Sequence, residues 1–228
     1  MNELGRGDDA AGLLPVHGFV LAGGKSSRMG RDKVLLAVGG RSMGQIAVEK
    51  LAGFCAEVSI AGNRPELRSM ASVVEEARQE VGPVGGIEAG LLASCYPWAM
   101  FLPVDVPFVP EALLRRWADQ VLARERDGLR LSFLSDGGDQ QPTFCMLHRA
   151  CRPLLSHAIE LGGRKLRSVF EQIETGLGYG SLWIAETGTL ISDDLCSKTS
   201  ASRWFFNINT PEDLAGVEVP LGSERGPE

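Results

Sequence analysis

The stretch of the chain best suited to chemistry is a loop in which glycines stand beside basic side chains. It directly follows an apolar run and reads L-A-G-G-K-S-S-R-M-G-R-D-K, from Leu21 to Lys33. Glycines allow backbone N–H groups to approach a ligand closely. Four cations stand against the single acid Asp32 (4 − 1), so the loop carries +3 in a chain of net charge −6. This is the chemistry of polyphosphate binding, although a glycine turn with solvated basic residues has the same composition. The spacing matches neither the P-loop nor G-x-G-x-x-G.

Other polar residues that could act with this loop stand at the ends of further apolar segments. Asp105 closes an apolar strand, where a carboxylate suits a hard cation such as Mg²⁺ or else caps a turn. Asn63 ends another strand, and its amide can serve a base or a ribose, or simply form a turn. Asn207 and Asn209 lie two residues apart on an expected strand over 203–208, so we expect both to face the same side.

These residues can act together only in a fold that brings the ends of several strands close to one another, and the hydrophobic pattern predicts such a fold. Apolar runs alternate with segments of helical periodicity, which is typical of an α/β fold with a mostly parallel sheet and helices on both faces. Beyond residue 129, two short strands around a glycine-rich turn predict a small β insertion. The expected strands are 18–22, 57–61, 98–104, 129–134, 143–148 and 203–208; the expected helices follow Ser42, cover 84–95 and 151–161, and begin at Pro110 and Thr210.

Length and composition favour one medium-sized domain. The chain has 228 residues, of which 44% are hydrophobic, and this suffices for a full core. We expect a flexible leader over residues 1–16, a single domain over 17–216 and a flexible tail over 217–228.

The same composition excludes several classes of protein. Five cysteines without a C-x-x-C pair argue against a disulfide framework or a zinc ribbon and favour a reducing compartment, the cytoplasm. The N-terminal segment lacks the pattern of a signal peptide, and no stretch approaches the ~20 apolar residues of a membrane helix. The net acidity argues against a protein that coats nucleic acid.

The exact order of residues in the glycine-rich loop resembles the signature of the molybdenum cofactor guanylyltransferase family, part of the MobA-like NTP transferases. Further matches follow in the family's order and extend the resemblance over residues 18 to 214. They are the segments Ala61–Arg64, Gly82–Leu91, Leu102–Pro107, Gln141–Thr143 and Asn207–Leu214. The guanylyl branch is favoured by the Asp-Lys pair that ends the first loop and by the G-P-x-x-G-I segment.

The resemblance implies a Rossmann-like nucleotidyltransferase fold and a Mg²⁺-dependent transfer of GMP from GTP to the phosphate of molybdopterin. It also assigns roles. The implied nucleotide contacts are Leu21, Ala22, Gly23, Gly24, Lys33, Asn63 and Asp105; the catalytic residues are Lys33, Arg28 and Asp105; the metal ligands are Asp105 and Asn209; and the acceptor-side candidates are Asn207, Arg164 and Lys165. Arg164 and Lys165 could instead form a solvated helix start. Where the family has an aspartate near the nucleotide, this chain has Glu76, and that role is not carried over.

Three alternatives stay open on the sequence. A cytidylyltransferase would make the cytosine form of the same cofactor, and a sugar-phosphate or isoprenoid-phosphate nucleotidyltransferase would share the fold and chemistry. A non-catalytic protein that binds a nucleotide or a pterin is the third. The partners implied by the resemblance are GTP and molybdopterin, with transient contacts to other proteins of cofactor synthesis or to recipient molybdoenzymes.

Overall fold

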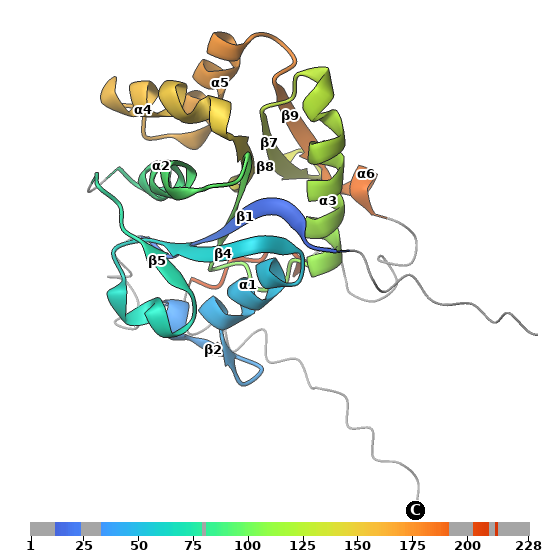
Figure 1. The fold of residues 1–228 in the computed structure, drawn as a ribbon. Coiled ribbons are helices and arrows are strands. Elements are labelled where there is room, and N and C mark those ends of the chain that lie inside the picture. The colour runs from blue at the N-terminus through green and yellow to red at the C-terminus, as the bar shows by residue number, and fades with distance from the viewer. Residues whose placement is uncertain (1–11, 24–32, 79–80, 192–202, 210–212, 214–228) are drawn as a thin grey trace, which may run out of the picture.

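The computed structural model describes residues 12–23, 33–78, 81–191, 203–209 and 213, and a seven-stranded sheet forms its centre (Figure 1). The strand order is β5-β4-β1-β6-β8-β7-β9, and β8 alone among these seven runs antiparallel to its neighbours. The strands are β1 (Leu14–Leu21), β4 (Cys55–Ala61), β5 (Ser72–Val74), β6 (Trp98–Pro103), β7 (Leu131–Asp136), β8 (Asp139–His148) and β9 (Leu182–Glu186). A separate two-stranded sheet joins β2 (Ala37–Val38) to β3 (Arg41–Ser42).

Helices cover both faces of the central sheet and enclose two apolar cores. Helices α1, α3 and α6 pack on one face, and α2, α4 and α5 pack on the other (Figure 1). Their bounds are α1 (Met43–Ala52), α2 (Pro83–Ala93), α3 (Glu111–Ala123), α4 (Arg152–Glu160), α5 (Leu166–Leu177) and α6 (Thr187–Leu190). Within the described part of the chain, no helix has both the length and the apolar character needed to cross a membrane.

Strand β1 lies between β4 and β6, and its position explains why most of its residues are apolar. Its last six residues, from Val16 to Leu21, are all buried. Val20 contributes to the core beneath α1 and α3, while Phe19 contributes to the core beneath α2. Successive side chains of a strand point to opposite faces, so a strand covered on both faces is mostly apolar. The buried polar side chain of this stretch, His17, is hydrogen-bonded to Ser59 Oγ at 3.0 Å.

The predicted α/β fold with a mostly parallel sheet is confirmed, together with several local details. Ser42 caps α1 through a reciprocal capping box with Gln45. Helix α4 is followed by Gly162, whose φ of +90° lies in the left-handed region that favours glycine. The predicted hairpin forms as β7 and β8, and both strands are part of the central sheet.

The expected strand over 203–208 is wrong. This segment contains turns and extended backbone without a ladder, and Phe206 N–H donates to Arg203 O at 3.2 Å. Its apolar composition reflects two buried anchors, Trp204 and Ile208, which pack into the core beneath α1 and α3. An apolar sequence predicts that side chains are buried, but it does not predict whether the backbone pairs with another strand.

Other boundaries also differ from the expectations. β1 begins at Leu14, so residues 14–16 belong to the sheet rather than to the expected leader. The sequence pattern does not predict strands β5 and β9, whereas helix α5 agrees with the alternative of a helix start at Arg164 and Lys165, since Lys165 is its N-cap. The rest of the expected leader up to residue 11, the tail over 217–228 and the helix start at Thr210 lie outside the described residues.

Helix α2 approaches the sheet closely at Gly90, and a substitution there can test this contact. A Cβ at this position would lie 2.8 Å from Phe101 Cε1 and 3.0 Å from Phe19 Cδ1, both within the core. We expect Gly90→Ala to lower the free energy of unfolding by about 1–3 kcal/mol, measured by urea denaturation, because the rings must shift. Gly188→Ala in α6 is the matched control, since no atom lies within 4 Å of its added Cβ. Equal stability of the two variants would contradict this account of the helix contact.

Candidate active site

A cavity of about 390 Å³ opens at the carboxyl ends of β1 and β6. In open α/β sheets this edge is where ligands bind, because the loops that follow the strands meet there. The cavity is lined by Leu21, Ala22, Gly23, Lys33, Val34, Pro83, Pro103, Val104, Asp105, Val106, Gln141, Thr143 and Asn207. The lining therefore includes five of the residues to which the sequence assigned nucleotide contacts and one of the three acceptor-side candidates.

The end of β1 supplies backbone to this cavity at close quarters. Ala22 N–H donates to Ala61 O at 3.0 Å and so continues the pairing with β4 past the last residue of β1. A Cβ at Gly23 would lie 2.5 Å from Glu76 Oε1, so any larger residue at this position would displace the Glu76 carboxylate. The predicted sites Gly24 and Arg28 lie outside the described residues.

Lys33 joins the two predicted metal ligands. Its Nζ donates to Asn209 Oδ1 at 2.5 Å and lies 3.7 Å from Asp105 Oδ2. The side chains of Lys33 and Asp105 are 21% and 29% exposed, so the ion pair remains open to solvent and to ligands. Three residues that the sequence analysis placed in one site therefore meet, although they come from distant parts of the chain.

The loop after β6, which carries Asp105, is held from two sides. Asp105 O accepts a hydrogen bond of 2.9 Å from Ile208 N–H, so the late segment is tied to this loop through its backbone. From α1, Lys50 Nζ donates to Pro107 O. Burial, and after it the nearby charge of Arg41, lowers the pKa of Lys50 to about 8. These contacts fix the backbone at Asp105 and two residues after it.

The sequence predicts that the two asparagines of the late segment share one face of a strand. This prediction is wrong, because no strand forms there. They still reach the same region, in different ways. Asn207 lines the cavity, whereas Asn209 is bound to Lys33. The backbone of the late segment is irregular and is tied to Asp105 at Ile208. Its side chains therefore need not alternate between two faces, as they would in a strand.

Asn63 uses its amide within the protein. Its Oδ1 accepts from Glu76 N–H at 2.8 Å, and its Nδ2 donates to Glu76 O at 3.4 Å. It does not line the cavity described above. The geometry therefore gives Asn63 the role of holding the segment around Glu76, and its predicted contact with the nucleotide stays a prediction.

The carboxylate of Glu76 extends between the end of β1 and the first turn of α2. Added Cβ atoms at Gly85 and Gly86 would lie 3.1 Å and 3.3 Å from its two oxygens. Three glycines, counting Gly23, thus leave room for this one side chain. Burial raises the pKa of Glu76 above its ordinary value.

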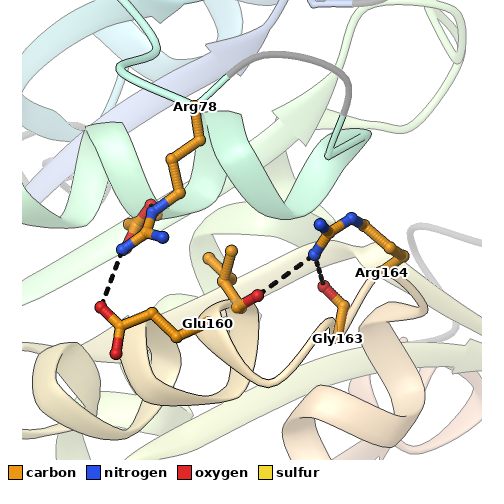
Figure 2. A network of polar contacts seen from close by, with 6 residues as sticks. Arg78, Glu160, Gly163 and Arg164 are labelled. Carbon is orange, nitrogen blue, oxygen red and sulfur yellow. Dashed lines mark hydrogen bonds and ion pairs between the residues drawn. The ribbon is translucent and has the colours of Figure 1, made fainter.

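The segment between Glu76 and α2 is also fastened by an ion-pair network (Figure 2). Arg78 Nε donates to Glu88 Oε2 on α2 at 2.9 Å, and another nitrogen of Arg78 donates to Glu160 Oε1 on α4 at 3.1 Å. The side chain of Glu88 is only 7% exposed, so it depends on Arg78 for compensation of its charge.

The two predicted basic residues of the acceptor side lie elsewhere. Arg164 donates to the carbonyl oxygens of Ile159 and Gly163 at 3.2 Å and 2.9 Å and thereby caps the end of α4 (Figure 2). Lys165 is the residue before α5. Neither lines the cavity, and the structure does not bring them together with Lys33 and Asp105.

Two polar side chains of the cavity, Gln141 and Thr143, received no role from the sequence. They were matched only as part of a motif. The signal that could have found them is Pro142, because a proline inside a strand pattern marks an interruption of the ladder, where side chains can be redirected.

Among the described residues, no group of three His, Cys, Asp or Glu side chains could hold a metal ion. The donor set at Lys33 nevertheless fits Mg²⁺, which prefers oxygen ligands and usually binds through one or two carboxylates together with substrate phosphates. Asp105 Oδ2 and Asn209 Oδ1 converge on the Lys33 ammonium, so a cation is already stabilised at this point.

Comparison with known proteins places these features in context. A family profile described as the MobA-like NTP transferase domain matches residues 18–176. The molybdenum cofactor guanylyltransferase of Vibrio cholerae is 32% identical over 200 residues, covering 86% of this chain and 88% of that protein. The enzyme of the same name from Serratia proteamaculans is 32% identical over 203 residues, covering 87% and 91%.

Solved structures agree in fold. Molybdopterin-guanine dinucleotide biosynthesis protein A from Archaeoglobus fulgidus superposes with a TM-score of 0.66 at 22% identity, covering 88% of this chain and 95% of that one. A CMP:2-keto-3-deoxy-manno-octonic acid synthetase in complex with CTP superposes with a TM-score of 0.62 at 14% identity, covering 89% and 96%.

The ion pair between Arg78 and buried Glu88 can be tested through stability. We expect Arg78→Met to lower the free energy of unfolding by about 2 kcal/mol, less than the ~3–5 kcal/mol for a fully buried pair, because Arg78 is partly exposed. Arg167→Met removes an exposed pair with Glu171 and should cost about 0.5 kcal/mol or less. Urea denaturation of both variants measures the difference, and similar losses would show that Glu88 does not depend on Arg78.

Proposed function

The chain belongs to the MobA-like NTP transferase family and is a nucleotidyltransferase, and on this premise we propose that it transfers GMP from GTP to the terminal phosphate of molybdopterin, free or metallated. The products are molybdopterin guanine dinucleotide and pyrophosphate. The observation that carries the proposal is the meeting of Lys33, Asp105 and Asn209 beside a cavity at the carboxyl ends of β1 and β6.

The choice of guanine and of a molybdopterin acceptor is supported by the relatives. Proteins named molybdenum cofactor guanylyltransferase share 32% of their residues with this chain over more than 85% of its length. The guanylyl form of the G-P-x-x-G-I segment begins α2, with Pro83 in the cavity wall. The proposal places the protein in the cytoplasm, where it would pass its product to recipient molybdoenzymes.

The chemistry of the acceptor simplifies what the protein must do. The second ionisation of a phosphate monoester falls near ~6, so the acceptor phosphate is a nucleophile at neutral pH. It attacks the α-phosphorus of GTP, a new P–O bond forms, and the bond to the leaving pyrophosphate breaks. No covalent intermediate and no general base is needed, so catalysis consists of positioning and charge stabilisation.

The residues of the cavity divide these tasks. The backbone at Ala22 and Gly23 would approach the nucleotide, and Lys33 would turn from Asn209 to the phosphates and counter the charge on the departing pyrophosphate. Asp105 and Asn209 would hold Mg²⁺, which, when bound, neutralises charge on the phosphates and orients them. Because Lys33 lies close to Asp105 Oδ2 and Asn209 Oδ1, the ammonium group and Mg²⁺ would both reach the phosphates of the same nucleotide.

The acceptor and base can be identified in one assay. Purified protein with Mg²⁺ and molybdopterin should release pyrophosphate and form a dinucleotide with GTP, and at least about tenfold less with CTP, ATP or UTP, since a base contact is typically worth a factor of this order. Product with CTP alone would instead identify a cytidylyltransferase. Binding of GTP without release of pyrophosphate would contradict the enzymatic proposal.

Removal of either charged group should abolish turnover in a folded protein. We expect Asp105→Ala and Lys33→Ala each to lower kcat/KM by about 100-fold or more, because each group stabilises charge that develops on the phosphates. Arg68→Ala is the control, since Arg68 forms an exposed pair with Glu75. Circular dichroism verifies folding, and a folded Lys33 or Asp105 variant with near-normal activity would disprove the assignment.

A further inference from the structure

One wall of the cavity is formed by a bulge in β8. Phe133 of β7 lies opposite Cys145, but the next residue of β7, Leu134, lies opposite Gln141. One step along β7 therefore corresponds to four steps along β8, and residues 142–144 are extra. The pairing of β8 with β6 also stops at Cys145, which lies opposite Phe101. Beyond this point β6 continues toward Asp105 without pairing to β8.

The residues of the bulge explain its shape. Pro142 has no N–H to give to a neighbouring strand, so the ladder cannot continue through it. Phe144 is fully buried and packs edge-on against Phe205, with 5.2 Å between ring centroids. Gln141 and Thr143, which flank Pro142, line the cavity instead.

The hairpin that carries the bulge is anchored at its tip. Gly137 N–H donates to Glu186 Oε1 at 2.5 Å, and Thr187 Oγ1 donates to Asp136 Oδ1 at 2.5 Å, so β9 and α6 hold the turn. Gln141 Nε2 donates to Asp139 Oδ2 at 3.0 Å. The amide of Gln141 is thus oriented before any ligand binds, and its carbonyl oxygen remains as an acceptor.

The bulge lies on the opposite side of β6 from β1 and from Gly23, which follows β1. The strand order β1-β6-β8 puts the loop with Asp105 between these two walls. Transfer of a nucleotidyl group is in line, so the attacking oxygen must approach from the side opposite the leaving pyrophosphate. If the triphosphate lies at Gly23 and Lys33, the nucleophile must enter over β8.

The chemistry of this wall suits a nucleophilic phosphate. Gln141, Thr143 and Asn207 are all uncharged, and Lys33 is the single cation among the described residues of the lining. A hydroxyl can orient a phosphate dianion by donating one hydrogen bond, whereas a cation bound to it would withdraw the electron density needed for attack.

We propose that the β8 bulge is the acceptor wall of the site, in which Thr143 Oγ1 donates to the attacking phosphate and the Gln141 carbonyl accepts from an N–H of the attached pterin. This inference rests on the proposed function and adds to it the residues that select the acceptor.

The test compares the effect of one substitution on the KM for molybdopterin with its effect on the KM for GTP. Thr143→Val removes the hydroxyl and keeps the side-chain shape; we expect the KM for molybdopterin to rise about tenfold, equivalent to about 1.4 kcal/mol, and the KM for GTP to change less than twofold. Thr143→Ser keeps the hydroxyl and should restore the wild-type KM. Thr175→Val is the matched control, because Thr175 is exposed on α5 and donates to Glu171 O.

The outcomes separate this inference from the proposed function. A wild-type protein that forms no dinucleotide from GTP and molybdopterin overturns both. An active wild-type protein whose Thr143→Val variant keeps the KM for molybdopterin, or loses affinity for GTP and molybdopterin equally, overturns the acceptor wall alone. Failure of Thr143→Ser to restore the KM overturns the role of the hydroxyl, because shape rather than hydrogen bonding would then control binding.

Discussion

The arrangement of the cavity depends on one cation held between two oxygens. Lys33, at the end of the glycine-rich loop, reaches Asn209, which lies 176 residues later in the chain, and also Asp105, which follows β6. None of these contacts has support from sequence proximity. They exist because parallel strands bring their carboxyl ends to one edge and because Ile208 ties the late segment to the backbone of Asp105.

The same edge also explains the distribution of charge. A net charge of −6 argues against a nucleic-acid coat, yet Lys33 lies within a cavity that suits a small anion. The acid that lines the cavity, Asp105, is paired with Lys33. Two further acids serve other tasks: Glu88 is paired with Arg78, and the carboxylate of Glu76 occupies space left by three glycines. The loop over 21–33 carries +3 in this acidic chain, and positive charge confined to one loop favours a small polyanion over a long one.

Segments with a strong local signal could be predicted from the sequence. The apolar core of β1, the capping box at Ser42 and the turn after α4 each follow from residue types within a few positions. The strand expected over 203–208 was wrong because Trp204 and Ile208 supply hydrophobicity for anchoring, without a partner strand. Strand β9 was missed, since a short edge strand has little buried surface to impose a pattern.

For the candidate site, the sequence alone determined which groups are available: backbone freed by glycine, a lysine, a carboxylate at a strand end and two asparagines. These follow from local order and from resemblance. Only the tertiary structure decided that Lys33, Asp105 and Asn209 meet, that Asn63 holds Glu76, that Arg164 caps α4, and that Gln141 and Thr143 form a wall. Lys33, Asp105 and Asn209 meet because distant strand ends share one edge of the sheet. The wall forms because the extra residues at the β8 bulge change the register between strands and redirect side chains. No local pattern encodes either effect.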